Sequence, residues 1–261
     1  MKPLVDFFIV GTQKGGTTAL DTYLRQHHQI DMAKVKEVHF FDNEKLDWEK
    51  PDYTILESFF DSPHDCEVCR GESTPIYMYW PLSMERLKKY NPAARIIVCL
   101  RHPAMRAHSH WRMSFCNKHE MLSFEEAISS RGMDRIVDLR KIENRLFSYI
   151  ARGFYSQQIE RILRLFARDQ VFFLRTDDLW LYKGEILNEV MDFLGVPRCP
   201  LPTDAKYIVP VNSLHVAQLD RDVYRNLLNL YADDICKTEQ LSGLFLHDWL
   251  SSSYHEPMIN G

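Results

Sequence analysis

The segment Leu4-Val-Asp-Phe-Phe-Ile-Val10 runs directly into Gly11-Thr-Gln-Lys-Gly-Gly-Thr-Thr18, and apolar residues then recur at Leu20, Tyr23 and Leu24. The first segment is rich in aromatic and β-branched residues, which favour a buried strand. The glycines that follow favour a tight turn, and the spacing of the last three apolar residues is typical of a helix. This stretch therefore predicts a strand, a glycine turn and a helix.

Two further segments predict buried strands of the same sheet. Arg95-Ile-Ile-Val-Cys-Leu100 and Val171-Phe-Phe-Leu-Arg175 are short and almost wholly apolar. Several patterns between and after these strands are typical of helices. One helix should end before Pro92, and Ser123 with Glu126 forms a capping-box pattern at the start of another. Apolar residues from Ile159 to Phe166 fall on one helical face, and the segment from Glu185 to Leu194 is followed by Gly195, a typical helix C-cap. Apolar strands that alternate with helices indicate an α/β fold, with a central parallel sheet flanked by helices in a P-loop-like arrangement. Because the chain shows no repeat and no long linker, residues 1–261 are predicted to form a single domain.

The composition excludes several classes of protein. The 261 residues are 45% hydrophobic and 26% charged, with a net charge of −4, so the chain can bury a core but lacks the basic surface of a general nucleic-acid or membrane binder. The apolar run at residues 4–10 is shorter than the about 20 residues that cross a bilayer, and it lacks the features of a signal peptide. We therefore expect a cytoplasmic chain, with no nucleic-acid or membrane partner, whose six cysteines are reduced thiols. The oligomeric state is left open.

The glycine turn lies where parallel-sheet proteins bind phosphate. Backbone N–H groups at a strand-to-helix turn point at an anion, and the helix dipole favours negative charge there. As in a Walker A loop, four residues separate Gly11 from Gly16, but Thr17 stands where that motif has its lysine. The lysine of this loop is Lys14, which moves positive charge toward the first phosphate of a ligand. A turn needed only for tight packing is the alternative interpretation.

The end of the second strand points to a second anion rather than to a metal. A Walker-type nucleotidase has an acidic residue there that binds magnesium, whereas this strand is followed by Arg101, with Ser109 eight residues later. Both residues could face one phosphate. A P-loop kinase is therefore the disfavoured alternative. Cys66-Glu-Val-Cys69 has no second ligand pair nearby, so we expect no metal site.

Together these segments resemble the sulfotransferases that use 3′-phosphoadenosine 5′-phosphosulfate (PAPS), most closely the heparan-sulfate-type sulfotransferase domains and bacterial small-molecule sulfotransferases. The segment Lys36-Glu-Val-His-Phe-Phe-Asp42 and the segment Arg152-Gly-Phe-Tyr155 are also similar to family segments. The resemblance implies that PAPS is the cofactor, that the product is adenosine 3′,5′-bisphosphate and that no metal is required. It implies the following cofactor-binding residues: Gln13, Lys14, Gly15, Gly16, Thr17, Thr18 and Ala19 at the 5′-phosphosulfate, Arg101 and Ser109 at the 3′-phosphate, and Tyr155.

The candidate catalytic residues are Lys14, Glu37 and His39, and the resemblance implies the role of Glu37. Sulfuryl transfer requires stabilisation of charge on the leaving phosphate oxygen, which the Lys14 ammonium can supply. A base must take the proton of the acceptor, and the family glutamate corresponds to Glu37. We expect its apolar neighbours to raise its pKa, although Lys36 acts in the opposite direction. His39 is the competing base.

Two departures from the family concern the acceptor. Ser73, in Gly71-Glu-Ser-Thr-Pro75, stands where glycan-sulfating relatives commonly have lysine. The lid expected near residues 203–214 has no matching motif, and Lys206 is its candidate cation. The sequence therefore favours transfer to a hydroxyl or amine of a small natural product in secondary metabolism, with a glycan acceptor or a non-catalytic nucleotide-binding module as alternatives.

Overall fold

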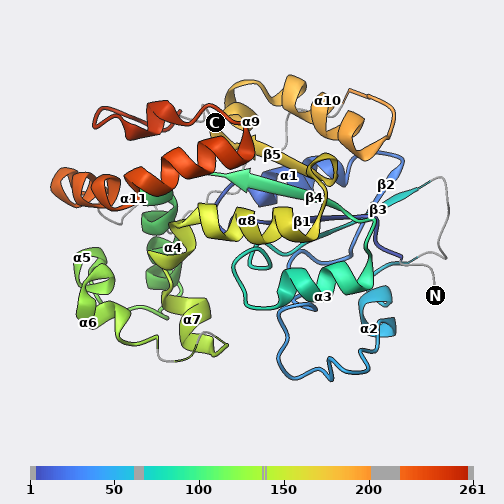
Figure 1. Cartoon of the computed structure of the whole chain (residues 1–261), viewed down its shortest axis with the longest axis horizontal. Coiled ribbons are helices and arrows are strands. Elements are labelled where there is room, and N and C mark those ends of the chain that lie inside the picture. The colour runs from blue at the N-terminus through green and yellow to red at the C-terminus, as the bar shows by residue number, and fades with distance from the viewer. Residues whose placement is uncertain (1–3, 62–67, 137, 139, 201–217, 258–261) are drawn as a thin grey trace. The chain divides into compact units, whose positions relative to one another are not determined.

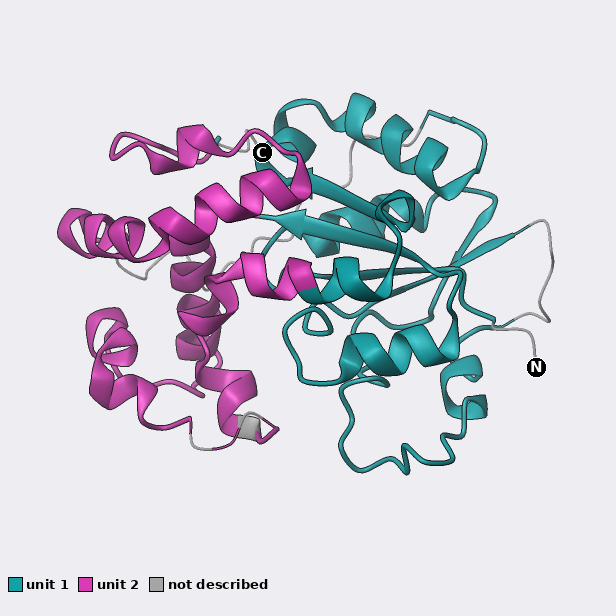
Figure 2. Ribbon diagram, viewed as in Figure 1, with its two compact units in different colours: residues 1–100, 161–206, 257–261 teal, residues 101–160, 207–256 magenta. Residues whose placement is uncertain are grey.

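The computed structural model describes residues 4–61, 68–136, 138, 140–200 and 218–257. The chain divides into two compact units (Figure 2). Unit 1 contains residues 1–100, 161–206 and 257–261, and unit 2 contains residues 101–160 and 207–256. The prediction of a single domain over residues 1–261 stays a prediction.

Unit 1 is built on a sheet of five parallel strands in the order β2-β3-β1-β4-β5 (Figure 1). The strands are β1 Phe7–Gly11, β2 Ile30–Met32, β3 Cys69–Ser73, β4 Arg95–Leu100 and β5 Val171–Arg175. The central strand β1 is buried along its whole length, as its apolar sequence requires. Strands β1 and β4 are neighbours and their register shifts between Ile9 and Gly11, so their carboxyl ends lie next to each other inside the unit.

Helices cover both faces of this sheet, with α3 and α10 on opposite sides (Figure 1). The helical segments of unit 1 are α1 Thr17–Leu24, α2 Thr54–Glu57, α3 Ser83–Tyr90, η2 Arg168–Gln170, α9 Thr176–Leu181 and α10 Lys183–Leu194, while α8 Tyr155–Leu165 begins in unit 2 and ends in unit 1. Helix α10 ends at Gly195, whose φ of 70° is the left-handed conformation that glycine adopts without strain.

Unit 2 is helical over its described residues. Its elements are α4 Pro103–Cys116, α5 Phe124–Ile128, α6 Ser130–Met133, α7 Ile142–Phe147, η1 Ala151–Gly153, α11 Arg221–Ser242 and η4 His247–Leu250. The capping box at Ser123 and Glu126 is present, with both reciprocal bonds. Asp234 of α11 accepts hydrogen bonds from the N–H groups of Tyr155 and Ser156, at 2.7 and 3.2 Å, and so fixes the start of α8 within this unit.

The predicted α/β fold with a parallel sheet flanked by helices is confirmed. Strands β4 and β5 have the predicted bounds, and β1 begins at Phe7 rather than Leu4. Helix α10 begins at Lys183 rather than Glu185. Strands β2 and β3 were not predicted. None of the described cysteines takes part in a disulfide bond, whereas Cys66 lies outside the described residues.

Candidate functional site

The glycine loop, residues 11–18, connects β1 to α1. Gly16 precedes the helix with a φ of 83°, which a residue with a Cβ atom adopts only with strain. At Gly15 a Cβ atom would lie 2.7 Å from the carbonyl oxygen of Cys99 and 2.9 Å from that of Thr12. The chain therefore needs glycine at both positions to bring the loop against the end of the neighbouring strand β4.

The loop is tied to the sheet by backbone and hydroxyl groups. The Thr12 N–H donates to the carbonyl of Cys99 at 2.9 Å. The Thr176 hydroxyl, at the start of α9, bonds the carbonyls of Gly15 and Leu100 at 2.8 and 3.0 Å. Gly16, the N-cap of helix α1, supplies no side-chain acceptor for the N–H groups of the first turn. A strand, a glycine turn and an uncapped helix N-terminus are the arrangement in which parallel-sheet proteins bind anions.

The residues predicted at the 5′-phosphosulfate lie together on this loop. Lys14 has a φ of 68°, and its side chain is half-buried. Thr17 is buried at the first position of α1, whereas Thr18 beside it is exposed. Residues 14–18 thus place one lysine, backbone N–H groups and the hydroxyls of Thr17 and Thr18 in one short stretch, and their role in binding stays a prediction.

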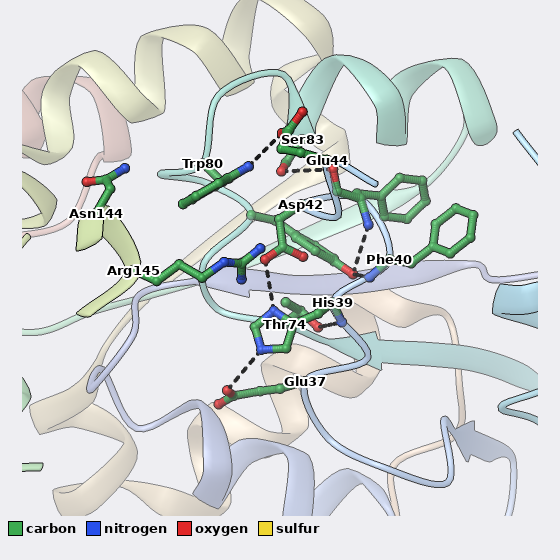
Figure 3. Close-up of polar contacts among 12 residues, drawn as sticks. Glu37, His39, Phe40, Asp42, Glu44, Thr74, Trp80, Ser83, Asn144 and Arg145 are labelled. Carbon is green, nitrogen blue, oxygen red and sulfur yellow. Dashed lines mark hydrogen bonds and ion pairs between the residues drawn. The ribbon is translucent and has the colours of Figure 1, made fainter. Parts of the chain in front are cut away.

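The second group of predicted residues lies on the loop of residues 37–42, which we call the Glu37 loop (Figure 3). The His39 Nδ1 lies 2.9 Å from Oδ2 of Asp42, and its Nε2 lies 3.7 Å from Oε2 of Glu37. Lys36 Nζ donates to Oε1 of Glu37 at 2.8 Å. Asp42 is fully buried, while the side chains of Glu37 and His39 are each 41% exposed. The structure therefore places a carboxylate, an imidazole and a buried carboxylate in a row that reaches the surface of unit 1.

The pKa of Glu37 moves in the direction opposite to our prediction. Burial raises it, as expected, but the hydrogen bonds and charges of His39 and Lys36 outweigh burial and lower the pKa from 4.5 to about 2. The prediction of a raised pKa is therefore wrong, because the sequence showed Lys36 but not the contact with His39. Glu37 is a carboxylate over the whole physiological range of pH.

In unit 2, Arg101 and Ser109 line one cavity of about 610 Å³. Three more arginines line it with them: Arg112, Arg221 and Arg225. Within this arginine cavity, Arg101 donates to both oxygens of Glu256, at 2.5 and 2.6 Å. Burial acts against the charged guanidinium, but Glu256 outweighs it and the pKa of Arg101 is raised. The cavity is thus lined by several basic side chains, and the Glu256 carboxylate is bound to Arg101, the residue predicted to bind phosphate.

Tyr155 acts on Arg101 from its backbone side. Its hydroxyl donates to the carbonyl oxygen of Arg101 at 2.8 Å, and its ring is fully buried. The structure therefore gives Tyr155 a contact that orients Arg101, and it shows how the three residues predicted in this unit come together.

Sequence reasoning missed Asp42 and Glu256. Asp42 follows His39 by three residues inside a segment that we had already singled out, so the pairing of an imidazole with a nearby acid was a usable signal. Glu256 follows Arg101 by 155 residues, and no local pattern marks that pair. The expected lid at residues 203–214, including Lys206, lies outside the described residues.

One group of potential metal ligands occurs among the described residues. Ligand atoms of His27, His28 and Cys199 lie within 4.8 Å of one another. However, Nε2 of His27 lies 2.8 Å from the carbonyl oxygen of Pro197, and its Nδ1 accepts the N–H of Gln29 at 3.0 Å. Both ring nitrogens are therefore engaged by the backbone, and this imidazole is not available to a metal in the observed arrangement.

A family model described as "Sulfotransferase domain" matches residues 4–206. The chain belongs to this family. The sulfotransferase domain is 29% identical over 201 residues to heparan sulfate glucosamine 3-O-sulfotransferase 3A1 of Mus musculus, covering 76% of the chain and 47% of the relative. It is 25% identical over 231 residues to the bifunctional heparan sulfate N-deacetylase/N-sulfotransferase 1 of Caenorhabditis elegans, covering 84% of the chain and 25% of the relative. The chain thus spans about a quarter to a half of the length of these curated relatives.

A solved structure agrees with the family assignment. The sulfotransferase of Alicyclobacillus acidocaldarius superimposes with a TM-score of 0.81 at 27% identity and covers 95% of this chain and 99% of its own. The family uses PAPS as its sulfate donor. In the described part of this sulfotransferase domain, no helix has the length and apolar character needed to cross a membrane.

Proposed function

We propose that this protein transfers a sulfuryl group from PAPS to a hydroxyl or amine of a small natural-product acceptor. The observation that carries the proposal is the arginine cavity: Arg101, which directly follows β4, and Ser109 line one basic cavity suited to a phosphate. A nucleotide kinase has a metal-binding carboxylate at such a strand end. A cation there suits a donor with a second phosphate group.

The glycine loop supplies the groups that the 5′-phosphosulfate requires. The N–H groups at the start of α1, with the hydroxyls of Thr17 and Thr18, hold the phosphate, and Gln13, Gly15, Gly16 and Ala19 complete the loop around it. Lys14 donates to the oxygen that bridges phosphorus and sulfur and stabilises its charge as the S–O bond breaks. Transfer of this kind depends on in-line positioning, and the rigid attachment of the loop to the sheet supports it.

We assign Glu37 as the base that takes the proton of the acceptor. Glu37 is ionised at neutral pH, but a pKa of about 2 makes its carboxylate a weak base. The assignment therefore rests on its position, in which Lys36 and His39 hold its two oxygens in fixed directions. His39 is the alternative base, because Asp42 holds its Nδ1 and leaves Nε2 directed toward Glu37. The acceptor hydroxyl or amine would attack sulfur as this proton leaves.

The acceptor distinguishes two versions of this function. Ser73 at the end of β3 is buried and supplies no positive charge, which favours a small acceptor without sulfate or carboxylate groups. The curated relatives are named for heparan sulfate, which keeps glycan sulfation as the second candidate.

The proposed function is tested with labelled donor and purified protein. Binding of adenosine 3′,5′-bisphosphate is measured by calorimetry, and transfer of ³⁵S from PAPS is screened over small hydroxyl and amine acceptors and over heparan fragments. We expect binding, transfer to small acceptors without added magnesium, and loss of at least a hundredfold in turnover for Lys14→Ala. Binding without transfer to any acceptor would instead support the non-catalytic nucleotide-binding module, and transfer only to heparan fragments would support the glycan candidate.

A further inference from the structure

Glu72, the fourth residue of β3, is a carboxyl group inside the core of unit 1. The residue is completely buried, and its register partner in β1 is Phe8. Across the part of the chain that the structure describes, no ion pair joins Glu72 to a basic side chain. Burying a carboxyl group destabilises the folded state unless its polar atoms form hydrogen bonds, so the hydrogen-bond partners of Glu72 indicate its function.

The partners of this strand end belong to the Glu37 loop. Glu37 and His39 have φ values of 64° and 55°, in the left-handed region that costs residues with a Cβ atom about 1–2 kcal/mol each. Such a conformation persists only when its surroundings hold it. The Glu37 N–H donates to the carbonyl oxygen of Ser73 at 2.8 Å, which is the first of a series of such contacts.

The side chains of Thr74 and Glu72 lie against the next part of the loop. The His39 N–H donates to Oγ1 of Thr74 at 3.4 Å (Figure 3). The backbone of Val38 acts on the Glu72 carboxyl in the direction that lowers its pKa. Thr74 and Glu72 are themselves joined by a short hydrogen bond between Oγ1 and Oε1. The N–H groups of Glu37 and His39 are therefore bonded to Ser73 and Thr74 at the end of β3, and Thr74 is bonded in turn to Oε1 of Glu72.

We propose that Glu72 is a positioning residue of this site: through Thr74 it holds the Glu37 loop in the conformation that brings Glu37 and His39 together. The effect of Glu72 on catalysis rests on the proposed function, whereas its effect on the conformation of the Glu37 loop does not. Tyr77 continues the same support, since its hydroxyl accepts the N–H groups of Phe40 and Phe41 at 3.0 and 3.4 Å.

The protonation state of Glu72 is part of this role. Burial raises its pKa to about 8, and the Asp42 carboxylate acts in the same direction. The titratable groups that face it are Asp42 and His39 from the loop and Tyr77 from the segment after β3, while β1 presents only Phe8 opposite it. At neutral pH Glu72 is therefore a neutral acid that bonds Thr74 without adding a second buried negative charge beside Asp42.

The test uses the full chain and hydrogen–deuterium exchange of peptides that cover residues 37–42. Glu72→Ala removes the bond to Thr74, and we expect exchange of this loop to rise at least tenfold, the effect of losing a buried hydrogen bond. Glu72→Gln keeps one acceptor and one donor, as in the neutral acid, and should stay within about threefold of wild type. Thr74→Val removes the link to His39 and should raise exchange there, which keeps the test open if Glu72→Ala does not fold.

The matched control is Glu120, a buried glutamate of unit 2 bonded to Arg135 and Tyr149. Glu120→Ala and Glu120→Gln should leave exchange of residues 37–42 unchanged. If Glu72→Ala also leaves this exchange unchanged, or if the glutamine variant loosens the loop as much as the alanine variant, the proposal is wrong.

Activity gives the second measurement, with the acceptor identified by the ³⁵S screen. For Glu72→Ala we expect kcat to fall at least tenfold while the affinity for adenosine 3′,5′-bisphosphate stays unchanged, and Glu72→Gln should restore kcat at pH 7. Wild-type kcat should decline above about pH 8, where Glu72 ionises, and the glutamine variant should lack this decline. An equal decline of kcat above pH 8 in the wild type and in Glu72→Gln would show that the proton of Glu72 has no part in positioning the loop. If the wild-type protein transfers no sulfuryl group, the proposed function fails, and the exchange experiment alone decides whether Glu72 positions the loop.

Discussion

Replacing Glu72 with glutamine should change how the stability of the protein depends on pH. Burial raises the pKa of Glu72 from 4.5 to about 8. Between these values the folded protein keeps a proton that the unfolded chain releases, so the free energy of unfolding falls as pH rises, by about 1.4 kcal/mol per pH unit. From pH 5 to pH 8 the loss reaches at most about 4 kcal/mol, and above pH 8 it stops because both states are ionised.

Glutamine has no proton to release, so Glu72→Gln should gain stability relative to wild type by up to that amount between pH 5 and pH 8. The measurement is urea unfolding by circular dichroism at half-unit steps from pH 5 to pH 9, in both proteins. Other groups that titrate in this range contribute equally to both and cancel in the difference. Parallel curves would refute the reasoning, since they would mean that Glu72 has the same pKa in both states.

Glu120→Gln is the matched control for this experiment. Glu120 is also buried, and burial alone would raise its pKa, but its hydrogen bonds with Arg135, Tyr149 and the backbone outweigh burial and lower it. A carboxylate of that kind contributes stability above its unfolded pKa and loses it only as pH falls through the lowered value. The difference between Glu120→Gln and wild type should therefore stay constant from pH 5 to pH 8.

Three further predictions concern the proposed binding and transfer. Gly15→Ala places a Cβ atom 2.7 Å from a backbone oxygen and should weaken binding of adenosine 3′,5′-bisphosphate more than tenfold. The control is Gly184→Ala, whose Cβ atom would have no heavy atom within 4 Å and which should leave binding unchanged. Equal effects of the two substitutions would contradict the packing of the loop. Glu256→Gln removes the ion pair with Arg101 and should tighten binding of adenosine 3′,5′-bisphosphate roughly fivefold, the factor for about 1 kcal/mol, as measured by calorimetry. Unchanged or weaker binding would show that Glu256 and the phosphate do not compete for Arg101. Turnover should stay level from pH 8 to pH 4 because Glu37 has a pKa of about 2, and a fall within this range would refute Glu37 as the base and favour the neighbouring histidine.

The sequence predicted the parts of the sheet that carry an apolar signal. Strands β4 and β5 were found with their correct bounds because nearly every residue in them is buried and apolar. Strand β3, with the sequence Cys-Arg-Gly-Glu-Ser, gave no such signal. It is nevertheless buried, because Arg70 pairs with Asp31 of β2 at 3.1 Å and Glu72 is held as a neutral acid. Pattern reasoning cannot detect a strand whose polar groups are satisfied by residues far away in the sequence.

The candidate site divides in the same way. The glycine loop was predicted in detail because local backbone requirements fix it: Gly15 and Gly16 are needed within a few residues of each other. The direction of the Glu37 pKa was wrong because it depends on a contact that only a folded loop makes.

The left-handed conformations of Glu37 and His39 explain why this loop had no local signature. Glycine or asparagine would adopt them with little strain, but neither can supply the carboxylate and the imidazole. The chain instead has the carboxylate and the imidazole at these positions, and hydrogen bonds from another segment hold their backbone. That segment is Glu72, Ser73 and Thr74 at the end of β3, more than thirty residues later in the sequence. A strained loop and a buried acid, each unfavourable alone, are thereby stabilised by the same hydrogen bonds, so substitution at Glu72 should affect the site and the stability of the fold together.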